Sequence, residues 1–216
     1  RMQGKVASRM PRVVVVSENS IQDIHTDMGV ELDRMRLVPV GVDPDLFRPL
    51  DDVSRRPGHL ITTASADVAL KGLAYLLEAM AKLRADGRVV TLTIIGRPKP
   101  GKSMDLIERY GLGEAIEAMC SGTPLVATDG GALPEVTGAD GETVFRCTAG
   151  DAGSLAASIA AALDNPERRE SVGLAGRQRV LERWTWRRCA EMTVDQYREV
   201  LAMPENIEKL RRNGRI

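Results

Sequence analysis

The regular alternation of β-rich runs and amphipathic helices from residue 59 onward constrains the fold of this chain more than any other feature. The runs 59–65 and 89–95 predict strands, the second of them buried on both faces. Between them, residues 71–85 predict a helix whose apolar face carries Leu73, Leu76, Leu77, Met80 and Leu83. Strand–helix–strand order with short connections favours parallel pairing, so the sequence predicts a doubly wound α/β sheet.

Further strands and helices are predicted on both sides of this stretch. Near the start, strands are expected at 13–16 and 36–40, around a helix that Ser17 caps and Gly29 ends. Two later strands are expected at 124–128 and 142–146. Helices 151–163, 166–183 and 186–202 complete the prediction, ahead of a charged tail.

One interval breaks the alternation. A helix expected at 104–110 is separated by only three residues from a helix that begins near Glu114. Parallel strands need a crossover, so a strand should lie between successive helices. We infer that residues are missing near 112–113, either deleted from the chain or absent only from its recorded sequence.

Composition changes once along the chain. The strand expected at 36–40 runs into a turn-rich connector, and the polar, breaker-rich stretch 51–58 that follows looks like a boundary between two units.

Charge and residue usage exclude several functions. Thirty basic residues balance thirty acidic ones and aromatics are only 3% of the chain, which argues against a nucleic-acid-binding protein. Cys120, Cys147 and Cys189 lack metal-ligand spacing and are odd in number, so we expect core thiols and a cytoplasmic protein. His25 and His59 form no metal-binding pattern, and no metal site is predicted. No apolar run is long enough to span a membrane.

Ligands of open parallel sheets bind beyond the carboxyl ends of the strands, so the loops there were searched for chemistry. Lys71 and Gly72 stand at the expected start of the helix 71–85, where a cation and free backbone N–H groups suit a phosphate. On spacing alone, Lys71 is better interpreted as a surface lysine in contact with water.

A second candidate lies around the helix that begins near Glu114. Glu114 and Glu117 share one helical face, and a carboxylate there can accept two vicinal ribose hydroxyls. Acidic residues are also favoured at the start of a helix because they interact with the helix dipole, and this interpretation is preferred for Glu114. Gly130 and Gly131 allow a ligand to approach the backbone closely.

Several stretches, in order, resemble GT-B retaining glycosyltransferases of the large family four. They are VPVGVDPDLFRP, LKGLAYLLEAMAKL, AIEAMCSGTPLVATDGGALPEVTG and the closing ERWTWRRCAEMTVDQYREVL. The resemblance covers nearly the whole chain and implies the C-terminal, donor-binding half of such an enzyme. It implies that residues 1–50 are the end of an N-terminal domain and the interdomain connector, that 51–185 form a Rossmann-like nucleotide-sugar-binding domain, and that 186–216 form a terminal crossing helix and its tail. Two features depart from the family: Arg109 stands where a sugar-binding glutamate is expected, and no arginine precedes Lys71.

The resemblance implies roles for three residues. Lys71 matches the lysine that neutralises the donor diphosphate and is the candidate catalytic residue, Gly72 opens the same helix, and Glu117 matches the glutamate that holds the ribose. The expected reaction transfers a sugar from a nucleoside diphosphate sugar, with UDP as the first candidate nucleotide and no cofactor. This chain alone is expected to be inactive.

The acceptor is left open among sugars, lipids and small molecules, and peripheral membrane contact is compatible with the sequence. The alternative is a truncated, non-catalytic module that binds nucleotide without turnover. An epimerase or phosphorylase would need a histidine or cofactor-lysine arrangement that the sequence does not offer.

Overall fold

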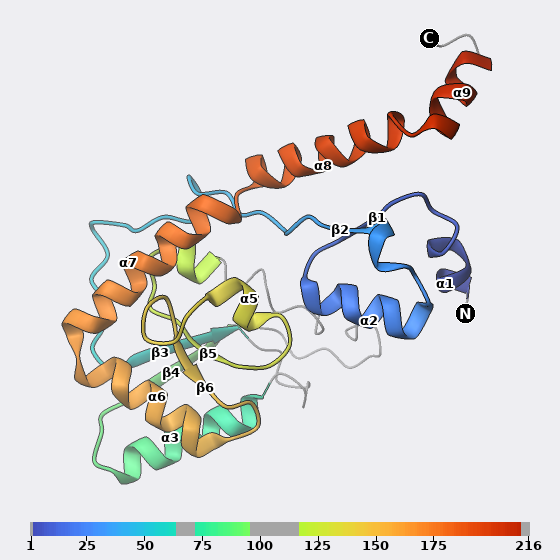
Figure 1. Ribbon diagram of the computed structural model, residues 1–216. Helices are drawn as coiled ribbons and strands as arrows, with labels where there is room; N and C mark the ends of the chain where they lie inside the picture. The colour runs from blue at the N-terminus through green and yellow to red at the C-terminus, as the bar shows by residue number, and fades with distance from the viewer. Residues whose placement is uncertain (1, 64–71, 96–116, 213–216) are drawn as a thin grey trace. The chain divides into compact units, whose positions relative to one another are not determined.

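The structure is a computed structural model that describes residues 2–63, 72–95 and 117–212 (Figure 1). Contacts between Cα atoms divide the chain into two compact units. Unit 1 comprises Arg1–Gly41 and Arg183–Ile216, and unit 2 is the continuous stretch Val42–Glu182. The second unit thus begins before the expected boundary at residue 51. Residues 186–216, expected to form a terminal crossing helix and its tail, group with residues 1–41.

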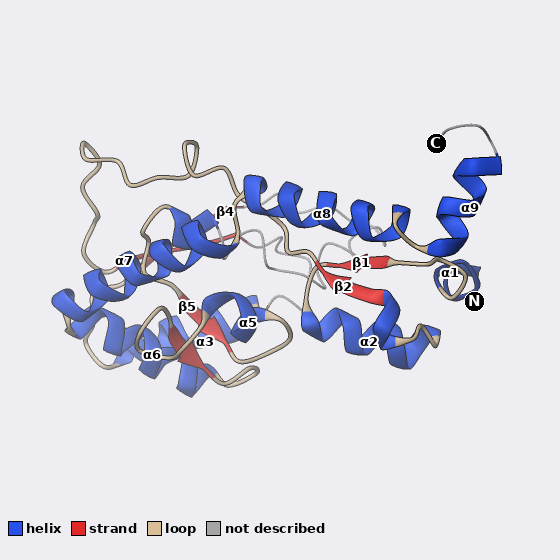
Figure 2. Ribbon diagram, turned by 45° about the horizontal axis from the view of Figure 1, so that its top comes forward, coloured by secondary structure: helices blue, strands red, loops and turns tan. Residues whose placement is uncertain are grey.

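Unit 1 joins elements from the two ends of the chain. Its elements are α1 (Met2–Ala7), β1 (Val13–Val15), α2 (Glu18–Met28), the 3-10 turn η1 (Leu32–Arg34), β2 (Met35–Leu37), α8 (Trp186–Leu201) and α9 (Pro204–Arg212). β1 and β2 pair in parallel, with Val14 opposite Arg36. Figures 1 and 2 show this pair between α2 and α8.

The local signals at the ends of α2 act as predicted. Ser17 lies outside the helix with its hydroxyl oxygen accepting from the backbone N–H of Ser20, at 3.1 Å. Gly29 ends the helix in the left-handed conformation, with φ 65°, and its N–H donates to the carbonyl of His25. Val30, just beyond, is fully buried with Val15 and Met35 in the core of unit 1.

Unit 2 has the predicted strand–helix order. Its elements are β3 (His59–Thr63), α3 (Leu73–Ala85), β4 (Thr91–Ile95), β5 (Val126–Thr128), α5 (Leu133–Thr137), β6 (Phe145–Cys147), α6 (Ala152–Asp164) and α7 (Pro166–Arg183), with helical residues at 117–120. β3 pairs with β4 and β5 with β6, both in parallel. The α/β class and the parallel pairing are confirmed, although the described strands form two separate pairs.

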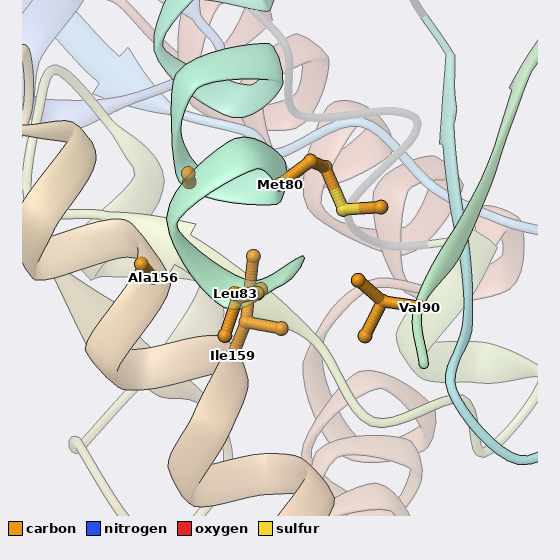
Figure 3. Close-up of a cluster of buried hydrophobic side chains, with 6 residues drawn as sticks. Met80, Leu83, Val90, Ala156 and Ile159 are labelled. Atoms are coloured by element: carbon orange, nitrogen blue, oxygen red, sulfur yellow. The ribbon is translucent and has the colours of Figure 1, made fainter. Parts of the chain in front are cut away.

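The core of unit 2 lies under α3 and α6. Met80 and Leu83 of α3 pack with Val90 and with Ile159 of α6, as Figure 3 shows. Strands from both pairs contribute to the same cluster, with Leu60 and Leu92 from one pair and Val126 from the other. One helical layer therefore covers one face of both strand pairs.

Two details of the predicted core are wrong. Leu77 was placed on the buried face of α3, but it is 51% exposed, because Ala79 occupies the buried position instead. The strand expected at 89–95 begins at Thr91 and is not buried on both faces. Val89 is exposed, and so are Ile94 and Ile95 at the far end of β4.

Candidate functional site

The start of α3 differs from the starts of the other long helices that the structure describes. The four other long helices of the described residues begin beside a side chain that accepts from their first-turn N–H groups. These capping residues are Ser17 for α2, Asp151 for α6, Asn165 for α7 and Thr185 for α8. Gly72 precedes α3 in the left-handed conformation, with φ 70° and no side chain to cap the helix.

The first turn of α3 is consequently electropositive. Its leading N–H groups have no intrahelical acceptor, and the helix dipole adds positive charge at this end. No acidic residue lies in this first turn to neutralise it. An anion such as a phosphate would satisfy these donors. Gly72, predicted as a binding residue, is the residue directly before this turn, and its binding role stays a prediction.

Two loops at the carboxyl ends of β5 and β6 are tied together by Asp129. The backbone N–H of Asp129 donates to the carbonyl of Cys147, at 3.0 Å. Its carboxylate accepts from the N–H of Ala149, at 2.9 Å. Gly131, with φ 57°, turns the first loop toward α5, and a Cβ on Gly130 would lie 3.5 Å from the Cβ of Ala149. Small residues therefore line the place where the two loops meet.

Tyr75 connects these loops to the start of α3. A Cβ on Gly72 would lie 4.0 Å from Cδ2 of Tyr75, and a Cβ on Gly150 would lie 3.9 Å from its hydroxyl oxygen. The uncapped turn and the loop after β6 therefore belong to one edge of unit 2. Sequence reasoning missed Tyr75 and Asp129. The position of Asp129 directly after a predicted strand was the available signal.

Glu117 belongs to a helical stretch whose C-terminal end accepts hydrogen bonds from two arginines. The carbonyl of Glu117 accepts from the N–H of Ser121, and Gly122 then ends the helix with φ 64°. Arg55 donates to the carbonyl of Gly122 at 2.7 Å, and Arg177 of α7 donates to that of Cys120. The side chain of Glu117 is exposed, as a ligand-binding carboxylate requires.

Three of the predicted residues lie outside the described residues. They are Lys71, Glu114 and Arg109, together with the helix expected at 104–110. The proximity of Lys71 to Glu117 therefore remains a prediction. Gly72 and Glu117 are the predicted site residues that the structure describes.

The buried thiols are held in the neutral form. Burial raises the pKa of Cys147 to about 11, and the nearby charge of Asp129 adds to the effect. Burial also raises the pKa of Cys120, against the opposing influence of Arg177. Both are core residues, as expected, whereas Cys189 on α8 is only half-buried.

The remaining candidates have structural roles. Nδ1 of His25 lies 2.8 Å from the carbonyl oxygen of Val30. Trp184 is buried at the junction of α7 and α8 as predicted, but Trp186 is exposed. Within residues 2–63, 72–95 and 117–212, no three metal-binding side chains gather. No helix among them is long and apolar enough to cross a membrane.

The fold of most of this chain is also found in proteins of known structure. A sucrose-phosphate synthase from Thermosynechococcus elongatus matches 93% of it, over 61% of its own length, with 21% identity and a TM-score of 0.76. The structure of Anabaena HepE in complex with UDP and glucose matches 91%, over 66% of its length, with 17% identity and a TM-score of 0.75. These likenesses, with the parallel strand pairs, define a Rossmann-like part of a GT-B fold.

Sequence comparison gives the family. Residues 111–179 match the family Glycosyl transferases group 1. The chain is 35% identical to the MMP alpha-(1->4)-mannosyltransferase of Mycolicibacterium hassiacum in an alignment over 237 residues that covers 93% of this chain and 57% of that enzyme. This chain therefore contains a glycosyl transferases group 1 domain of the GT-B, family-four type and is a homologue of that mannosyltransferase. It spans little more than half of the relative's length.

The alignment with the mannosyltransferase is longer than this chain. It runs over 237 residues, whereas the chain has 216 and only 93% of them take part. The mannosyltransferase thus carries residues inside the aligned interval that have no counterpart here. The chain is therefore shorter than the mannosyltransferase over the interval that the two share.

Proposed function

We propose that this chain is the donor-binding part of a retaining glycosyltransferase that takes a sugar from a nucleoside diphosphate sugar. The observation that carries the proposal is the uncapped, acid-free first turn of α3 at Gly72, which follows Lys71 in the sequence. The diphosphate would accept from the backbone N–H groups of this turn. The Lys71 ammonium would neutralise its charge.

The reaction breaks the bond between the anomeric carbon and the diphosphate oxygen, and it forms a bond from the same face to an acceptor hydroxyl oxygen, whose proton passes to the departing diphosphate. Negative charge grows on the departing diphosphate as the bond breaks. Fixed dipoles and a cation that are already in place stabilise that charge without reorganisation. Lys71 is therefore proposed to act on the leaving group, and Glu117 to hold the ribose through its hydroxyls.

The relatives support the choice of donor. Anabaena HepE has been crystallised with UDP and glucose, and the aligned relative is named as a mannosyltransferase. UDP is therefore the first nucleotide to test, and mannose and glucose are the first sugars. The acceptor is a sugar, a lipid or a small molecule. The free cysteines suit the reducing cytoplasm, where we place the protein.

Calorimetry with UDP, GDP and ADP tests the proposal on the full chain. UDP should bind, and Lys71→Ala should weaken its binding by about tenfold or more, because a charge-assisted contact is lost. Lys82→Ala, at the other end of the same helix, is the matched control and should bind normally. The proposal fails if none of the three nucleotides binds, or if the two variants behave alike.

A second candidate function is a nucleotide-binding module without turnover. The residues that the mannosyltransferase carries inside the aligned interval favour it, because this chain lacks them. Nucleotide binding without release of sugar from UDP-glucose or GDP-mannose would select this candidate. Sugar transfer to any acceptor would exclude it.

A further inference from the structure

The helical residues 117–120 are closed at their carboxyl end by the backbone and by a side chain of α7. The N–H groups of residues 121–123 donate back to the carbonyls of residues 117–119, at 2.9 to 3.0 Å. The carbonyl of Cys120 accepts instead from the guanidinium of Arg177. A cation at this end also interacts favourably with the helix dipole. The turn that begins with Glu117 is therefore held from α7 as well as by its own backbone.

Two glycines let α7 lie directly against this turn. A Cβ on Gly173 would lie 2.6 Å from the carbonyl oxygen of Gly122, closer than any real side chain. A Cβ on Gly176 would lie 3.4 Å from Cε of the fully buried Met119. Both glycines are buried. Gly173 and Arg177 are four residues apart and share one face of α7, so the close packing and the arginine contact act on the same turn.

The guanidinium of Arg177 also reaches a second backbone segment. Its Nη1 donates to the carbonyl of Phe47, at 3.2 Å, in the connector that opens unit 2. The same connector contacts the end of the Glu117 turn, because a Cβ on Gly122 would lie 3.3 Å from Cγ of Pro49. Arg177 thus joins the connector, the Glu117 turn and α7 through one planar cation, whose donors point in fixed directions.

The position of Glu117 depends on this contact because the two are close along the chain. Glu117 and Cys120 are three residues apart, which corresponds to less than one turn and a rise of about 4.5 Å. A displacement of the Cys120 carbonyl is therefore passed on to the backbone of Glu117. A binding side chain has to stay within about 0.5 Å of its productive position, and residues behind it provide that precision.

We infer that Arg177 is a positioning residue, which holds the turn of Glu117 where its carboxylate can accept the ribose hydroxyls of the donor nucleotide. This inference rests on the proposed function, in which Glu117 holds the ribose. The guanidinium of Arg177 donates to backbone carbonyls, so it acts through Glu117 and not on the nucleotide. Loss of Arg177 should consequently affect recognition of the ribose more than recognition of the diphosphate.

Binding of UDP and of 2′-deoxy-UDP separates these two kinds of recognition. The two nucleotides differ by one ribose hydroxyl, so the ratio of their dissociation constants measures the contact made at that hydroxyl. Calorimetry on the full chain should give a preference for UDP of about tenfold, as one charge-assisted hydrogen bond provides. In Glu117→Ala the preference should fall below about threefold, because the accepting carboxylate is gone.

Arg177→Met should lower the preference to the same extent as Glu117→Ala. Combining the two substitutions should cause no further fall, because both remove the same contact. The matched control is Arg169→Met. Arg169 also lies on α7 and donates to two carbonyls at the end of α6, those of Ala162 and Leu163, at 3.1 and 3.2 Å. Its loss should leave the preference unchanged.

Circular dichroism establishes first that each variant is folded. If Arg177→Met does not fold, Arg177→Lys takes its place, because it keeps a cation but loses the planar arrangement of donors. The same fall below about threefold is expected for it.

An unchanged preference in the Arg177 variant would overturn the inference, including the case in which both nucleotides bind more weakly by the same factor. An equal fall in Arg169→Met would also overturn it, since the effect would then be a general one. Equal binding of UDP and 2′-deoxy-UDP by the native chain would remove Glu117 from the ribose and overturn the inference, while the diphosphate contact of the proposed function would stand. Absence of any nucleotide binding by the native chain would instead overturn the proposed function itself, and this inference with it.

Discussion

Gly41 and Trp186 meet backbone to backbone, at the point where the chain leaves unit 1 and close to where it returns. A Cβ on Gly41 would lie 2.5 Å from Cα of Trp186 and 2.6 Å from the carbonyl carbon of Thr185. Real side chains do not approach backbone atoms so closely, and backbone atoms cannot rotate away. The start of α8 therefore packs against a position that only glycine can occupy.

Gly41→Ala should therefore lower the free energy of unfolding by about 2 kcal/mol or more, because the methyl group forces α8 away. Urea unfolding followed by circular dichroism measures this change. Gly153→Ala is a suitable control, since Gly153 is exposed in the first turn of α6 and should change stability by less than about 0.5 kcal/mol. Equal effects of the two substitutions would contradict the packing argument.

Arg12 holds α8 to the rest of unit 1. Its guanidinium donates to Glu199 at 2.8 Å and to the carbonyl of Asp33 at 3.0 Å, and its side chain is only 11% exposed. Arg12→Met should cost about 1 kcal/mol of unfolding free energy, because a mostly buried cation loses two acceptors.

The matched control for Arg12 is Arg198→Met. Arg198 pairs with Asp195 on the exposed side of the same helix, and both side chains are in solvent. Such a pair contributes little, so the loss should stay below about 0.5 kcal/mol. Thermal unfolding of both variants distinguishes them, and a larger loss for Arg198→Met would refute the assigned role of Arg12.

Leu83 and Leu77 lie on the same helix with opposite environments. Leu83 is 1% exposed in the cluster of Figure 3, whereas Leu77 faces solvent. Leu83→Ala should cost about 3 kcal/mol, through lost burial and a cavity, and Leu77→Ala less than about 1 kcal/mol. Chemical denaturation gives both values. Similar losses would mean that the orientation of α3 differs from the one described.

The raised pKa of Cys147 predicts a loss of stability at alkaline pH. The ordinary pKa of a thiol is 9.0, and burial raises that of Cys147 to about 11. Between these values the unfolded chain releases the proton while the folded chain keeps it, so stability falls as pH rises. Below pH 9 both states keep the proton and the contribution is constant.

Comparison with Cys147→Ala isolates that contribution. The difference in unfolding free energy between the native chain and the variant should be constant up to about pH 8 and should then shift against the native chain as pH rises toward 11. Urea titrations across this range provide the measurement. A difference that stays constant throughout would show that the thiol titrates normally in the folded protein.

Local signals made much of this fold predictable. Ser17 and Gly29 bound α2 as expected, because a capping hydroxyl and a left-handed glycine act on neighbouring backbone groups. Strand–helix alternation likewise predicted the parallel pairing. These features depend on residues close together in the sequence.

Features that depend on distant segments were not predicted. The exposure of Ile95 could not be read from an apolar run, because cover comes from another part of the chain. The grouping of α8 with residues 1–41 depends on contacts such as the ion pair between Arg12 and Glu199. No local sequence pattern predicts such a contact.

The candidate site was predicted in part for the same reason. Gly72 was named because the family resemblance matches it to the start of a helix, and the structure places it one residue before α3 rather than within the helix. Tyr75 was missed because its contact with Gly150 joins residues far apart in the chain. The role of Asp129 was missed because the loop that it holds follows a different strand.

The interrupted makeup of unit 1 has a consequence for synthesis on the ribosome. Residues 1–41 leave the ribosome before Val42–Glu182, and Arg183–Ile216 leave it afterwards. Unit 2 can therefore fold during translation, whereas residues 1–41 can pack with α8 and α9 only once these helices have left the exit tunnel. A premature stop codon directly before α8 would leave residues 1–41 without these helices, while unit 2 would still be synthesised in full.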